Sequence, residues 1–92
     1  MARILIVEDD RITALALQRA VTRIGHTVLA CVSSAFEAMA AVQAFHPDMV
    51  LLDIHLSGSQ NGLLTGIDIQ TLWSTPVIYL SGSSGRVEAP CG

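Results

Sequence analysis

The residues best suited to chemistry in this sequence are carboxylates that follow apolar segments. Glu8, Asp9 and Asp10 come directly after the apolar run 4–7, and Asp53 stands at the end of another apolar segment. Carboxylates gathered in one pocket repel each other, so either some stay protonated with a raised pKa or a cation lies among them. A hard divalent cation such as Mg²⁺ suits oxygen ligands of this kind.

A carboxylate beside such a cation can also attack a phosphoryl group and form an aspartyl-phosphate. The cation would offset charge on the transferring group. Ser81 ends a later apolar segment, so its hydroxyl could hydrogen-bond a phosphoryl oxygen, and Gly82 leaves room for that group to enter. The competing interpretation is structural, because Asp10 is more often a helix cap and Ser81 alone is as well explained by a turn. Asp53 together with the acidic pair Glu8 and Asp9 favours a functional site over a purely structural role.

The segments that must position these residues alternate between two periodicities. Short, largely β-branched apolar runs predict strands over 3–8, 26–32, 49–54 and 76–81. Helical spacing and end signals predict helices over 12–24, 34–44 and 63–73. This alternation predicts right-handed βαβ units and an α/β fold with a doubly wound parallel sheet. In such sheets the site lies at the carboxyl ends of the strands, where all these polar residues should converge.

Several side chains carry expectations about capping and packing. Asp10 is placed to cap the first helix and Gly25 to end it, while Ser34 and Glu37 form a predicted capping box for the second. The side chains expected on apolar faces or in the core are Leu17, Ala20, Val21, Ile24, Cys31, Phe36, Met39 and Trp73. The run 55–62 is predicted to be a loop from its composition.

Composition bounds the classes of function. The 92 residues suggest one domain, and 51% hydrophobic with 14% charged residues excludes a disordered polar segment. The net charge of −3 and the lack of a Lys/Arg cluster argue against direct nucleic-acid binding. No apolar run approaches the roughly 18 residues of a spanning helix, so no membrane association is expected. Two isolated cysteines without metal-type spacing favour a reducing, cytoplasmic setting.

Taken together, the motifs resemble the receiver domain of two-component response regulators. The matching stretches are "ILIVEDD" (4–10), "PDMVLLDIHL" (47–56), "NG" (61–62) and "TPVIYLSG" (75–82), in the family's order and spacing. The resemblance implies a receiver-like, flavodoxin-like domain over residues 1–82. Residues 83–92 have no apolar period and are predicted to form a disordered tail.

The resemblance also implies a role for each matching residue. Asp53 would accept a phosphoryl group from a partner histidine kinase, Ser81 would be the switch hydroxyl, and Gly82 stands where a small residue is usual. The cofactor would be Mg²⁺, with Asp9 binding directly and Glu8 through water. The implied metal ligands are Glu8, Asp9, Asp53 and the backbone carbonyl of His55.

The chain departs from the family pattern after its fourth strand. The family has five strands in the order 2-1-3-4-5, and the fifth strand, with its Lys and aromatic switch residue, is missing here together with the last two helices. The sequence contains no Lys at all. We therefore expect weakened phosphorylation chemistry. We also expect an exposed fourth-strand edge, "VIYL", that supports a homodimer through strand addition or exchange.

Two other functions stay open. A degenerate receiver would keep the fold and act by binding or dimerisation without phosphorylation. A Mg²⁺-dependent phosphatase with an Asp nucleophile would need an acid catalyst two residues beyond Asp53, where this sequence has His55, and a phosphate-anchoring Lys. The retained carboxylates of Glu8, Asp9 and Asp53 favour a phosphoacceptor. The missing Lys favours a degenerate receiver.

Overall fold

The computed structural model describes residues 1–54 and 62–80 of the chain. Within them the elements are β1 (Arg3–Val7), α1 (Arg11–Arg23), β2 (Thr27–Val32), α2 (Ala35–Phe45), β3 (Met49–Asp53), α3 (Gly62–Trp73) and β4 (Val77–Leu80). The predicted alternation of strand and helix is confirmed. Gly62, predicted to end a loop, is instead the first residue of α3. The rest of that predicted loop and the predicted tail 83–92 lie outside the described residues.

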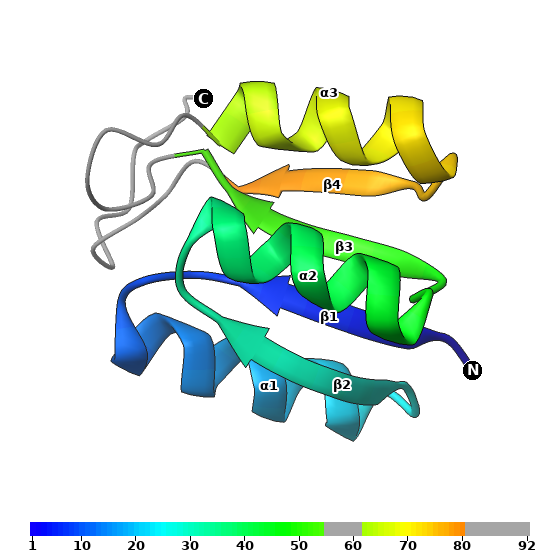
Figure 1. Ribbon diagram of the computed structural model, residues 1–92. Coiled ribbons are helices and arrows are strands. Elements are labelled where there is room, and N and C mark those ends of the chain that lie inside the picture. Colours follow the sequence, from blue (N-terminus) through cyan, green and yellow to red (C-terminus); the bar gives the residue numbers. More distant parts are fainter. Residues whose placement is uncertain (55–61, 81–92) are drawn as a thin grey trace, which may run out of the picture.

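The described strands form one parallel sheet in the order β2-β1-β3-β4. Helix α1 covers one face, and α2 and α3 cover the other (Figure 1). The predicted doubly wound α/β architecture is therefore confirmed in this part of the chain. The two central strands read as continuous apolar runs because helices cover both of their faces. None of the described helices has the length and apolar character that crossing a bilayer requires.

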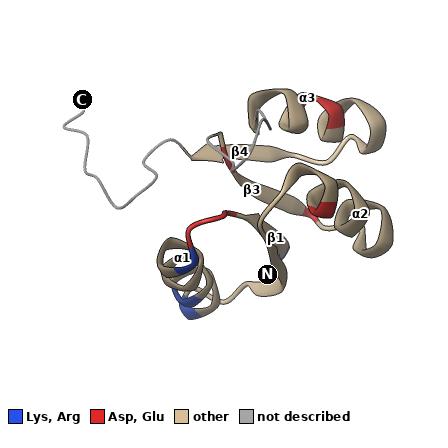
Figure 2. Ribbon diagram, turned by 60° about the vertical axis from the view of Figure 1, so that its left-hand side comes forward, with Lys and Arg blue, Asp and Glu red and all other residues tan. Residues whose placement is uncertain are grey.

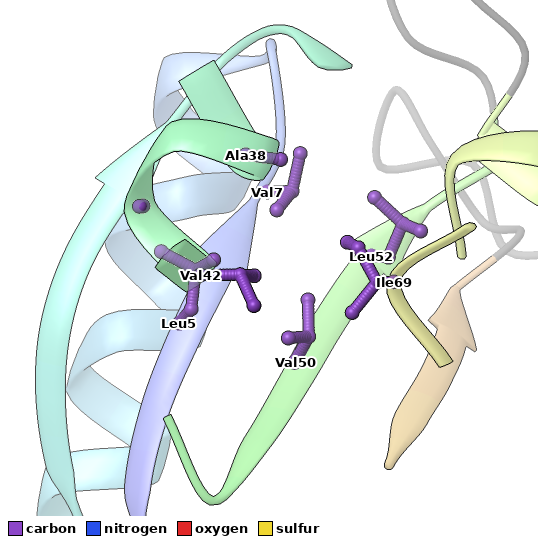
Figure 3. Packing of buried hydrophobic residues seen from close by; sticks show 8 residues of the cluster. Leu5, Val7, Ala38, Val42, Val50, Leu52 and Ile69 are labelled. Carbon is purple, nitrogen blue, oxygen red and sulfur yellow. The ribbon is translucent and has the colours of Figure 1, made fainter. Parts of the chain in front are cut away.

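Two apolar clusters hold the helices to the sheet. Side chains on the α2 and α3 side include Leu5, Val7, Ala38, Val42, Val50, Leu52 and Ile69 (Figure 3). The cluster on the α1 side is built from Ile4, Ile6, Val21 and Leu51. Successive residues of β1 and β3 thus alternate between the two faces, as the pleat of a strand requires. This packing fixes the register in which β1 and β3 present their carboxyl ends.

The predicted caps fix where the helices begin and end. A side-chain oxygen of Asp10 accepts a hydrogen bond from the backbone N–H of Thr13 at 3.0 Å. Ser34 accepts one from the N–H of Glu37 at 3.2 Å. The Glu37 carboxylate accepts from the N–H of Ser33 at 3.0 Å, one residue before the cap, and this bond lowers the pKa of Glu37. Gly25 follows α1 with a φ of 98°, a conformation that favours glycine.

Four of the expected apolar positions are exposed instead. Ile24 is 71% exposed because it is the C-cap of α1 and lies off the face that packs on the sheet. Ala20 is exposed on the same helix, whose buried positions are Ala14 and Val21. Phe36, in the first turn of α2, is 82% exposed and lies away from that helix's buried side. Cys31 is exposed because β2 is an edge strand. The positions predicted correctly are Leu17, Val21, Met39 and Trp73, which pack in the clusters.

Candidate functional site

Three of the predicted site carboxylates meet at the carboxyl ends of the two central strands. Each of Glu8, Asp9 and Asp53 has an oxygen that lies within 4.8 Å of those of the other two. Val7 pairs with Leu52 across the sheet; Glu8 is the residue that follows β1, and Asp53 is the last residue of β3. The turn that carries Glu8, Asp9 and Asp10, here called the acidic turn, joins β1 to α1, whose basic residues are drawn in blue (Figure 2). The register of the sheet therefore brings together residues that are far apart in the sequence.

Burial makes this cluster electrostatically unusual. Glu8 is 4% exposed and Asp53 is 1% exposed, whereas Asp9 is half-buried. The pKa of Glu8 is raised to about 7, first by burial, then by hydrogen bonding with Asp53, and further by the charges of Asp53 and Asp9. Burial disfavours an ionised carboxyl, and neighbouring negative charge does the same. Glu8 consequently keeps its proton to a higher pH than an ordinary carboxyl group does.

Asp10 belongs to the scaffold of this turn. Its carboxylate caps α1 by accepting from the N–H and the hydroxyl of Thr13. Its own backbone N–H donates to Glu8 Oε2 at 3.2 Å, and this bond opposes the rise in the pKa of Glu8. The expectation that Asp10 is a helix cap is confirmed, and the cap also orients the Glu8 side chain.

Gly62 brings the first turn of α3 against the end of β3. Its N–H donates to the carbonyl of Ile54 at 3.1 Å. A β-carbon at this position would overlap the carbonyl oxygen of Asp53 and the α-carbon of Ile54, which are backbone atoms that cannot turn aside. Glycine therefore allows a close approach that fixes the backbone beside Asp53. Sequence reasoning gave Gly62 no such role, although the "NG" motif marked the position.

A hollow of about 630 Å³ opens beside the acidic turn, between α1 and the end of β2. Its lining includes Glu8 and Asp9, the Arg11 side chain and the largely apolar group Ile12, Ala14, Leu15, Cys31 and Val32. Two of the three carboxylate residues of the cluster thus border this hollow. The other predicted site residues, His55, Ser81 and Gly82, lie outside the described residues.

The chemistry of these donors fits a hard divalent cation. All three side chains offer carboxylate oxygens, which Mg²⁺ prefers, and Mg²⁺ usually takes one or two protein carboxylates together with waters. Burial raises the pKa of Glu8 most, and the neighbouring charges of Asp53 and Asp9 add to the rise. A cation bound there would relieve the repulsion and displace the proton.

Comparison with known proteins gives one consistent family. A sequence model described as "Response regulator receiver domain" matches residues 4–89. The phyllosphere-induced regulator PhyR of Methylorubrum extorquens is 32% identical over 84 residues, which make up 90% of this chain and 32% of PhyR. The sensory/regulatory protein RpfC of Xanthomonas campestris is 33% identical over 84 residues, covering 86% of this chain and 11% of RpfC. The chain thus spans about a third or less of the length of these relatives.

Solved structures show the same likeness at the level of the backbone. The signal receiver domain of a modulated diguanylate cyclase from Desulfovibrio desulfuricans has a TM-score of 0.83 at 30% identity, covering 91% of this chain and 67% of that one. PhyR from Brucella abortus has a TM-score of 0.84 at 30% identity, covering 88% of this chain and 33% of that one. The likeness extends over most of the chain.

Proposed function

Since this chain belongs to the response regulator receiver domain family, the non-catalytic signalling modules of two-component systems, we propose that Asp53 is its phosphoryl acceptor. The supporting observation is the cluster of Glu8, Asp9 and Asp53 at the carboxyl ends of β1 and β3. Receiver domains of two-component systems work in general with histidine kinases, and such a kinase is the proposed donor.

In the proposed reaction a carboxylate oxygen of Asp53 attacks the phosphorus of a phosphohistidine. A P–O bond forms to Asp53, and the P–N bond to the kinase histidine breaks. Glu8, Asp9 and Asp53 would hold Mg²⁺, which when bound offsets the negative charge of the phosphoryl group. The burial of Asp53 excludes bulk water from the acceptor oxygen, so charge interactions at that atom are stronger than in solvent.

The remaining roles rest on the sequence motifs that match the family. The backbone carbonyl of His55 would be a further metal ligand. The hydroxyl of Ser81 would hydrogen-bond a phosphoryl oxygen, and Gly82 would leave room for that group. His55 is two residues beyond Asp53, and Ser81 and Gly82 directly follow β4 in the sequence; strands of a parallel sheet end at the same edge.

A second candidate function is binding or dimerisation without phosphorylation. It is favoured by the position of β4, which has only β3 as its partner strand in the described part of the sheet. Several large apolar side chains of α3 beside it are exposed, and the sequence has no Lys to pair with a phosphoryl group. Both functions are compatible with one fold, and they differ in whether Asp53 is modified.

Intact mass spectrometry after incubation with acetyl phosphate and Mg²⁺ tests the first function. We expect a phosphoryl adduct on the wild type and none on Asp53→Asn. Asp68→Asn is the matched control, because Asp68 is an exposed residue of α3 outside the cluster, and it should be modified like the wild type. The proposal would be contradicted by a folded wild type that gains no adduct, or by an adduct that persists on Asp53→Asn. Binding or dimerisation without phosphorylation would then be the remaining candidate function.

A further inference from the structure

The acidic turn, the red segment between β1 and α1 in Figure 2, ties the Glu8 carboxylate to the start of a helix. The backbone N–H of Glu8 donates to the carbonyl of Val32 at 2.9 Å, which fixes the main chain of Glu8 at the end of β2. The side-chain Oε2 of Glu8 accepts from the backbone N–H of Asp10 at 3.2 Å. The orientation of the Glu8 carboxylate therefore depends on where the N–H of Asp10 points.

Helix α1 determines where the N–H of Asp10 points. Asp10 is the N-cap of α1 and has an extended backbone, with φ −85° and ψ 114°. Its carboxylate accepts from the N–H of Thr13 at 3.0 Å and from the Thr13 hydroxyl. Its carbonyl accepts from the N–H of Ala14 at 2.9 Å. These three hydrogen bonds hold Asp10 to the first turn of α1, and Val21 packs the same helix on the sheet.

The N-cap of α1 uses its N–H differently from the start of α2. In a capping box, the side chain at the third helical position accepts from the N–H of the N-cap. In α2 that position is Glu37, whose carboxylate accepts from the N–H of Ser33, one residue before the cap. In α1 the same position is Thr13, whose hydroxyl donates to the Asp10 carboxylate, and the N–H of Asp10 donates to Glu8. The cap of α1 is therefore bonded to a residue of the functional site instead of a carboxylate of its own helix.

We propose that Asp10 is a positioning residue for the cation site: by capping α1 it fixes the N–H that orients the Glu8 carboxylate within the acidic cluster. The inference rests on the proposed function, in which this cluster, Glu8, Asp9 and Asp53, holds Mg²⁺. Hydrogen bonds orient ligating carboxylates, and removing the partner typically lowers metal affinity about 10–100-fold. A Glu side chain has several rotatable bonds, so without the bond from Asp10 the binding of a cation would first have to order it.

Mg²⁺ titrations followed by NMR amide shifts test this role with two variants that carry the same charge. Asp10→Ala and Asp10→Asn both remove one negative charge beside the site, but the side-chain oxygen of Asn can still cap α1. We expect the Mg²⁺ dissociation constant of Asp10→Ala to exceed that of Asp10→Asn about tenfold. Ser34→Ala removes the equivalent cap of α2, so it should lower the Tm and leave the dissociation constant at the wild-type value.

Two further comparisons separate positioning of Glu8 from a general loss of stability. In a Glu8→Ala background, Asp10→Ala and Asp10→Asn should bind Mg²⁺ with equal dissociation constants, because the side chain through which Asp10 acts is gone. The second comparison needs no metal. The backbone amide of Asp10 should exchange its proton slowly in the wild type and faster in Glu8→Ala, which removes the acceptor of its hydrogen bond.

The role of Asp10 is overturned by equal dissociation constants for Asp10→Ala and Asp10→Asn, or by a difference between them that persists with Glu8→Ala. It is also overturned if Ser34→Ala raises the constant as much as Asp10→Ala, or if the Asp10 amide exchanges equally in the wild type and Glu8→Ala. A wild type that binds no Mg²⁺ would overturn the cation site itself and this role with it. If Asp10→Ala does not fold, Thr13→Val replaces it, since it removes the hydroxyl donor to Asp10; an unchanged constant would then overturn the proposal.

Discussion

Glu8 and Asp53 stand side by side at the ends of the two central strands, and hydrogen bonding links their carboxyl groups. Both side chains are almost completely buried. The hydrogen bonding and the negative charge of Asp53 both help to raise the pKa of Glu8, after the larger effect of burial. Either a proton or a cation can compensate the charge of this pair. This competition makes the stability of the chain depend on both pH and divalent metal.

Raising the pH should destabilise the metal-free chain through Glu8. In the unfolded chain Glu8 loses its proton near 4.5, whereas in the folded chain its pKa is about 7. The folded state therefore holds the proton longer, and the stability present below pH 4.5 is lost as the pH rises through about 7. The loss amounts to roughly 3 kcal/mol at most. Urea unfolding in the presence of a chelator measures it.

Glu8→Gln is the control for this pH dependence. The amide has nearly the same shape but no proton to lose in this range, so the variant should lack the Glu8 contribution. The difference between the two proteins isolates Glu8 from the other titrating groups. Equal slopes for the wild type and Glu8→Gln between about pH 4.5 and about pH 7 would show that Glu8 does not titrate with a raised pKa.

Magnesium should stabilise the folded chain, and more strongly above about pH 7 than below it. The reason is that below its raised pKa Glu8 carries a proton, which the metal must displace. At a metal concentration about 100 times the dissociation constant, the gain is about 2.7 kcal/mol. Thermal melts with Mg²⁺ and with chelator measure the effect. Asp9→Asn should reduce the gain in Tm on adding Mg²⁺, and Asp68→Asn should not. An equal gain in Tm for the wild type and both variants would mean that the metal binds outside the acidic cluster.

Gly62→Ala should destabilise the chain by about 1–3 kcal/mol, the usual range for overpacking. The new methyl group would overlap backbone atoms of Asp53 and Ile54, so either α3 or the end of β3 must move. Because the displaced backbone carries Asp53, the stabilisation by Mg²⁺ should also decrease. Denaturant unfolding with and without Mg²⁺ measures both effects. Leu63→Ala, at a half-exposed position in the same turn, should have a smaller effect on both the free energy of unfolding and the stabilisation by Mg²⁺.

Gly66 and Tyr79 should be coupled in a double-mutant cycle. A β-carbon on Gly66 would lie 2.5 Å from the Cε1 atom and the hydroxyl oxygen of Tyr79. Gly66→Ala alone should therefore destabilise the chain. In a Tyr79→Val background the overlap is gone, and the same change should stabilise by about 1 kcal/mol through helix propensity. Unfolding free energies of the four proteins give the coupling, and simple additivity would mean that Tyr79 does not limit this position.

Much of this architecture could be predicted from local patterns. Buried parallel strands such as β3 leave continuous apolar runs, and Asp10 and Ser34 cap the helices through contacts within one turn. The meeting of Glu8 with Asp53 followed from the general rule that parallel strands end at one edge. Other features depend on packing between elements, which the spacing of residues along the sequence does not reveal. Phe36 is apolar and lies on a helix, yet the buried side of α2 is built from small residues, Ala38 and Ala41 among them.

Gly62 and Cys31 show why tertiary context decides the rest. The close approach of Gly62 to Asp53 joins positions nine residues apart in the sequence, so no periodicity reveals it. Cys31 lies on β2, which reads like a central strand but has β1 as its only partner in the described sheet. The raised pKa of Glu8 depends on distances within the cluster, which only the folded structure supplies.

The central position of β1 has a consequence for the order in which the sheet can be assembled. Arg3 pairs with Thr27, but on the other side Ile4 pairs with Met49, which comes 45 residues later in the chain. Ribosomes add about 5–20 residues per second, so β1 emerges roughly 2–9 seconds before the strand that completes its second side. During synthesis β1, whose residues Ile4–Val7 are buried in the folded chain, is therefore left with an open edge, and this interval is when the nascent chain has most need of a chaperone.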